Sequence, residues 1–120
     1  MAIIELTGTT DGAGDLTVTA DKAVTGFVEK IVWDNSSAAA TADITFSAVG
    51  QITENLLVIT DQAQADAPYY PRAIPNKVAD ASAFTDAAVP IFVEGATMKM
   101  VVAQGGATKV CRALVHVREV

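Results

Sequence analysis

Apolar and polar residues alternate along several short stretches of this chain, and that alternation is its strongest structural signal. In residues 42–48 (ADITFSA) the even-numbered positions are apolar and the odd-numbered positions are polar. Residues 16–20 (LTVTA) alternate in the same way. A period of two residues, rich in β-branched and aromatic side chains, is typical of a β-strand with one buried face. The pattern therefore predicts strands whose even-numbered residues in these two stretches face a core.

Other apolar stretches bounded by turn signals predict additional strands. These lie at 2–7, 25–34, 52–60, 89–93, 98–103 and 109–118. Glycine and aspartate mark the intervening turns, including those expected at 9–15, 21–26 and 94–97. Seven or eight short strands in one chain of 120 residues predict an all-β fold over residues 1–120. We expect a single-domain, antiparallel, jelly-roll-like β-sandwich.

Two β-hairpins are expected from the connections between these strands. A polar connection of small residues joins 25–34 to 42–48, and the sequence QGGAT at 104–108 joins 98–103 to 109–118. Within 25–34, Phe27, Ile31 and Trp33 share one parity, whereas Glu29 and Lys30 place charges on both faces. A strand of this kind is expected to have one face against the core and the other face toward a neighbouring molecule.

Regular alternation stops between residues 61 and 88. This segment holds three of the four prolines and both tyrosines, and proline removes a backbone donor that a central strand needs. We expect one long irregular crossover loop, with a turn or two of helix at 78–88 capped by Asn76. Tyr69, Tyr70, Pro71 and Arg72 have the side chains that are enriched at interfaces. They either bind a partner or cover the end of the sandwich, and the two roles are compatible.

Composition and charge narrow the possible partners. The net charge of −6 and the pI near 4.5 disfavour binding to nucleic acid and to anionic membranes. No apolar run approaches the roughly 20 residues of a membrane span, and the first residues lack the basic region of a signal peptide. A lone cysteine excludes an internal disulfide and fits a reducing compartment.

Candidate chemistry is sparse. Cys111 and His116 are the only thiol and imidazole, and five positions along a strand place them on opposite faces, about 17 Å apart. They cannot form a nucleophile–base pair, so Cys111 is expected in the core. His116 lies between Arg112 and Arg118 on the other face, which is either a solvated surface or a basic patch for an acidic neighbour.

No enzymatic, cofactor or metal site is expected from the remaining motifs. Residues 11–15 (DGAGD) lack the ligand spacing and the distal glutamate of an EF-hand, which favours a surface turn. The aspartates at 61–88 show no spacing that pairs them for hydrolysis of a glycosidic bond. Phosphate loops, dinucleotide fingerprints and nucleophile elbows are absent from the sequence.

Several short motifs resemble those of small virion proteins of tailed bacteriophages. They are IVWD at 31–34, ADITF at 42–46, YYPR at 69–72, VPIFV at 89–93 and MKMVVAQGG at 98–106. The family consists of head decoration, or cement, proteins, and residues 1–24 match its pattern least. The resemblance implies a β-sandwich on the exterior of the capsid, made in the cytoplasm of the host bacterium, which binds the major capsid protein and stabilises the head.

Within that reading, the contact energy is expected from the proline loop, the face of Phe27 and Trp33, and terminal strands that add to neighbouring sheets. A homotrimer is expected from the threefold sites that such proteins occupy, and a dimer is the alternative. Two other functions stay open: a tail, fibre or baseplate module with a similar fold, and a carbohydrate-binding or hydrolytic β-sandwich.

Overall fold

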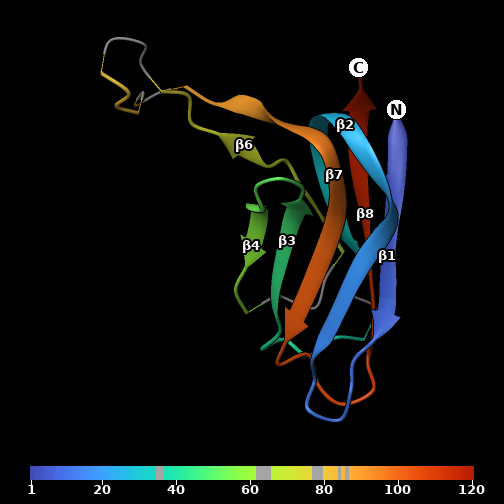
Figure 1. Ribbon diagram of the computed structural model, residues 1–120. Coiled ribbons are helices and arrows are strands. Elements are labelled where there is room, and N and C mark those ends of the chain that lie inside the picture. Colours follow the sequence, from blue (N-terminus) through green and yellow to red (C-terminus); the bar gives the residue numbers. More distant parts are fainter. Residues whose placement is uncertain (35–36, 62–65, 77–79, 84, 86) are drawn as a thin grey trace.

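The computed structural model describes residues 1–34, 37–61, 66–76, 80–83, 85 and 87–120. These residues form eight β-strands (Figure 1). The strands are β1 (Ala2–Thr9), β2 (Leu16–Asp34), β3 (Asp43–Val49), β4 (Glu54–Ile59), β5 (Ala67–Tyr69), β6 (Arg72–Ala73), β7 (Val89–Ala103) and β8 (Val110–Glu119). The described residues include no helix, and therefore no helix that could cross a membrane.

All eight strands belong to one antiparallel sheet. Its main order is β1-β8-β2-β7-β3-β4, while β5 pairs with β2 and β6 pairs with β7. This confirms the predicted all-β, antiparallel fold. The hydrogen bonding is continuous and does not divide the strands into two separate sheets, so the jelly-roll sandwich stays a prediction.

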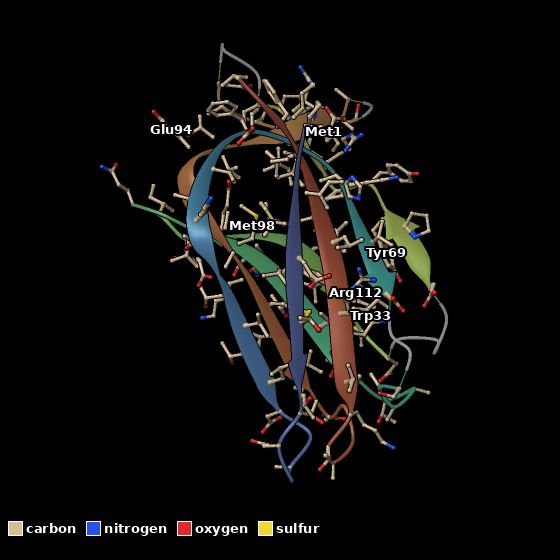
Figure 2. All side chains as sticks on the ribbon, turned by 90° about the vertical axis from the view of Figure 1, so that its right-hand side faces the viewer. Met1, Trp33, Tyr69, Glu94, Met98 and Arg112 are labelled. Atoms are coloured by element: carbon tan, nitrogen blue, oxygen red, sulfur yellow. The ribbon has the colours of Figure 1, made fainter. Side chains whose placement is uncertain are left out.

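The sheet bends because β2 changes partner along its length. Its first part pairs with β7, and its last part pairs with β8, with register shifts near residues 19–23, 24–26 and 28–30. In Figure 2 the start and the end of β2 pass on opposite sides of β1 and β8. A Cβ on Gly8 of β1 would lie 2.9 Å from Cδ1 of Leu16, so β1 packs against the inner face of the first part of β2.

The concave side of this bent sheet holds the core. Its largest fully buried side chains are Trp33, Phe46, Leu6, Ile31, Ile44, Met98, Met100, Val28, Val102, Val115 and Val117. The predicted burial of the four apolar residues at 42–48 is confirmed, because they are at most 2% exposed, but Ser47, which was expected on the other face, is buried as well. Cys111 is buried as predicted, on the same side of β8 as Val115 and Val117.

Both predicted hairpins are wrong. In the sheet, β7 lies between β2 and β3, and β2 lies between β7 and β8. The expected turns at 21–26 and 94–97 are also wrong, because β2 and β7 run through them as long strands with bulges. The glycines there serve the strands: Gly95 has φ of +54°, and a Cβ on Gly26 would lie 2.3 Å from the carbonyl oxygen of Arg118.

The parity predicted for 25–34 fails at a bulge. The register of β2 against β8 shifts between Val28 and Lys30, and a one-residue shift moves later side chains to the other face. Ile31 and Trp33 therefore point into the core, whereas Phe27 points outward.

The segment 61–88 is less irregular than expected, since it contributes β5 and β6. Part of the predicted helix at 78–88 lies outside the described residues, and the described part is not helical. Asn76 is not a helix cap: it forms an isolated bridge with Ala83, and its Nδ2 donates to the carbonyl oxygen of Ala81 at 2.9 Å. Beside β6, the first residues of β7 extend away from the rest of the sheet (Figure 1).

Candidate functional site

The motif at 69–72 splits into inward and outward residues. Tyr69 is half-buried against the core and Pro71 is buried, whereas Tyr70 is 60% exposed. Arg72 is exposed, but its Nη1 donates to the carbonyl oxygen of Glu29 at 3.2 Å and to that of Pro71 at 2.7 Å. Arg72 therefore braces this segment against β2, and Tyr70 is the residue of the motif that presents a large surface to solvent.

The side chain of Trp33 is not accessible to a partner protein. Its side chain is 0% exposed, and it lies on the strand that pairs with both β5 and β8. This corrects the prediction that Phe27 and Trp33 form one interface. The sequence misled because a tryptophan among charged residues is typical of interfaces, while the bulge that turns Trp33 inward leaves no clear sequence signal.

The arginines of β8 are neutralised by carboxylates of the same chain. Arg112 pairs with Glu5 of β1 at 2.9 Å and with Asp34 of β2 at 3.1 Å. These two carboxylates, Glu5 more than Asp34, raise the pKa of Arg112. The sequence analysis missed both acids as partners, because their pairing depends on strand order rather than on sequence spacing. This face therefore does not form the predicted basic patch for an acidic neighbour, because its arginines are paired with acids of the same chain.

His116 lies on the same face of β8. It stands in register with Ile3 of β1 and Lys30 of β2. Partial burial lowers the pKa of His116, and the charge of Lys30 lowers it further. Burial likewise raises the pKa of the Cys111 thiol, which lies on the inner face as expected. A weakly basic imidazole and a protonated thiol on opposite faces do not form a catalytic pair.

A partly exposed aromatic cluster, formed by half-buried Phe27 with exposed Phe92 and Arg118, lies where β2, β7 and β8 meet. The two phenyl rings meet edge to face, with centroids 5.1 Å apart. Cζ of Arg118 lies 4.8 Å from the centroid of the Phe27 ring, and its Nε donates to Glu29 at 2.7 Å. Phe92 is 44% exposed and was not among the sequence candidates. Pro90, inside the apolar run at 89–93, is the sequence signal that could have indicated an exposed strand edge at Phe92.

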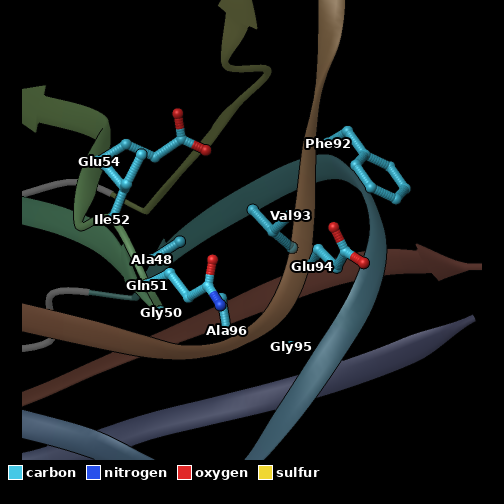
Figure 3. Close-up of a pocket in the computed structure, with 10 residues that line it drawn as sticks. All are labelled: Ala48, Gly50, Gln51, Ile52, Glu54, Phe92, Val93, Glu94, Gly95 and Ala96. Carbon is cyan, nitrogen blue, oxygen red and sulfur yellow. The ribbon is translucent and has the colours of Figure 1, made fainter.

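Described residues line hollows on the surface. One, of about 500 Å³, separates the β3–β4 connection from the middle of β7 (Figure 3). Another, of about 410 Å³, lies between β1 and the first part of β2. Among the described residues, no three histidine, cysteine, aspartate or glutamate side chains are grouped to hold a metal ion.

In the loop at 11–15, the carboxylate of Asp11 accepts hydrogen bonds from the backbone of the same loop. Oδ1 of Asp11 accepts hydrogen bonds from the backbone N–H of Ala13 at 2.9 Å and of Asp15 at 3.0 Å. These bonds, Asp15 first, lower the pKa of Asp11. The carboxylate thus stabilises the turn that precedes β2, in agreement with a surface turn.

Comparisons with protein-family models, with curated proteins and with solved structures find no match for this chain. The described residues form an all-β protein that exposes several large aromatic and apolar side chains. The resemblance to decoration proteins therefore stays a prediction.

Proposed function

We propose that this chain is a non-enzymatic decoration protein of a bacteriophage head, which binds the outer surface of the major capsid protein. One observation carries the proposal: large apolar side chains are exposed along β6, the start of β7 and the residues beside them. They are Tyr70 (60%), Ile74 (60%), Val89 (40%) and Phe92 (44%). Exposed apolar groups that gather in one region are typical of sites that bind another protein.

The surrounding structure supports a role in adhesion. The aromatic cluster provides large side chains at little entropic cost, and an arginine stacked on an aromatic ring is common at interface hot spots. Arg72 ties the segment that carries Tyr70 to the backbone of β2, so the contact surface is ordered before binding. Preorganisation of this kind reduces the entropy lost on association.

Binding to purified heads tests the proposal. Wild-type protein is mixed with DNA-free, tailless heads assembled from the capsid protein encoded with this chain, and co-sedimentation measures occupancy. We expect saturable binding that Tyr70→Ala weakens about tenfold or more, as for an interface hot spot. The matched control is Val58→Ala, which alters a similarly exposed side chain (57%) on β4 and should leave occupancy unchanged. Failure of the wild type to bind heads, or binding to tails alone, would contradict the proposal.

A further inference from the structure

The edge of β7 that faces β3 is unpaired beyond the end of β3. β3 pairs with residues 97–103, and a Cβ on Gly50, which follows β3 in the chain, would lie 3.7 Å from Cβ of Ala96. Within the part of the chain that the structure describes, no strand pairs with residues 91–95 on this edge, while β2 pairs along the opposite edge. This unpaired stretch of β7 is called the gap below.

Backbone polar groups point into this gap. The carbonyl oxygen of Glu94 lies 3.7 Å from the position that a Cβ on Gly50 would take, so it faces the β3–β4 connection. In an antiparallel strand the amide and carbonyl of one residue point to the same edge, and residues two apart share that edge. The backbone groups of Phe92 are therefore directed to the gap as well. In contrast, the Gly95 N–H donates toward β2, to Oγ1 of Thr25 at 2.9 Å.

The 500 Å³ hollow borders this edge (Figure 3). Buried Ala48, Val93 and Ala96, each at most 4% exposed, provide apolar groups in its lining. Exposed Ile52, at 83%, lies on the opposite side from β7. A strand added here would bury apolar side chains on one face while its backbone completed the ladder, which is how extended peptides bind to sheet edges.

The negative charge around the hollow favours a basic ligand. Glu54 and Glu94 line it from opposite sides, and neither forms an ion pair within the described ranges. A lysine or arginine can lay its aliphatic stem along an apolar surface while its charged end reaches a carboxylate. A second copy of this chain has a net charge of −6, so it complements the two glutamates of the hollow less well than a basic segment does.

We propose that the gap at residues 91–95 of β7 binds an extended segment of a partner protein as an added strand, with a lysine or arginine directed to Glu54 and Glu94. The inference rests on the proposed function, because it names how such a binding protein would hold its partner. About five residues of strand, some 17 Å long, fill a gap of this length.

Hydrogen exchange of the full-length chain on DNA-free heads tests the added strand. We expect exchange to slow at least tenfold in the peptide that covers residues 91–95 when the chain is bound. Binding without slower exchange there would overturn the added strand and leave the proposed function intact. If this segment of the free chain became more protected against exchange as the protein concentration increased, the gap would be assigned to a second copy. That result would also overturn the inference.

A synthetic peptide decides the inference even if heads are not bound. The probe is a seven-residue strand of alternating valine and threonine with a central lysine. Its controls are the same peptide with N-methylated backbone amides and one with glutamate in place of lysine. We expect both controls to bind at least tenfold more weakly. Glu54→Gln and Glu94→Gln should each weaken the lysine peptide about two- to fivefold, the range for exposed ion pairs. Equal binding of the N-methylated peptide, or no binding at millimolar concentration, would overturn the inference.

Discussion

Replacing Trp33 with alanine should destabilise the isolated protein strongly, because this residue is part of the core. The side chain is 0% exposed, and a buried tryptophan removes about 200 Å² from water. At about 25 cal/mol per Å² this burial contributes about 5 kcal/mol. Alanine retains part of that area, and the cavity adds a penalty, so we expect a loss of about 3–5 kcal/mol. A domain of this size has about 5–15 kcal/mol of stability in total.

Chemical denaturation followed by far-ultraviolet circular dichroism measures this loss. Dichroism is needed because the variant lacks the only tryptophan of the chain. Tyr70→Ala is the control, since that side chain is 60% exposed and its removal should change the free energy of unfolding by no more than about 0.5 kcal/mol. A loss below about 1 kcal/mol for Trp33→Ala would refute the placement of this residue in the core, and with it the bulge that turns the end of β2 inward.

Two further predictions concern the β2 strand and its neighbours. Gly26→Ala should destabilise the protein by about 1–3 kcal/mol, because the new Cβ would lie 2.3 Å from a backbone oxygen of β8. Gly12→Ala, where nothing lies within 4 Å, is its control, and equal denaturation midpoints for the two variants would contradict the close approach. His116 should titrate below its usual value of 6.5 because of burial and of Lys30. The unfolded chain then binds the proton more tightly. The stability linked to His116 is therefore complete above pH 6.5 and falls as the pH drops through the lowered pKa. Nuclear magnetic resonance of the imidazole measures that pKa, which Lys30→Gln should raise, and a value at or above 6.5 in the native protein would refute the reasoning.

Local alternation predicted the residues of the core well where the strands are regular. In the middle of β8 every second residue is buried, and in β3 the same holds except that Ser47 is buried too. The sequence shows this pattern directly because side chains alternate with a period of two. The same reasoning failed for Phe27 and Trp33. A bulge between Val28 and Lys30 changes the parity, and it arises from how β2 shares its pairing between β7 and β8.

Strand order was beyond the reach of the local signals. Turn residues such as those at 104–108 show that the chain reverses, but not which strand becomes the neighbour of the next. Both expected hairpins failed because another strand lies between their members. The partners of Arg112 were missed for the same reason, since Glu5 and Asp34 are distant in sequence and meet only in the assembled sheet.

Only some of the interface residues expected from the sequence are exposed in the structure. Tyr70 is exposed as an interface residue requires, whereas Trp33 and Pro71 are buried. Arg72 donates to the backbone carbonyl oxygens of Glu29 and Pro71, and the arginines of β8 pair with acids of the same chain. Phe92 became a candidate only when β2 and β7 were placed side by side, which brings its ring against Phe27.

A cryo-electron microscopy reconstruction of the head with this protein bound tests the central claim most directly. The account predicts additional density on the outer surface of the capsid into which the bent sheet fits, with Tyr70 and Phe92 directed toward the shell. Unchanged heads in the presence of saturating protein, or density with these two residues directed to solvent, would contradict it.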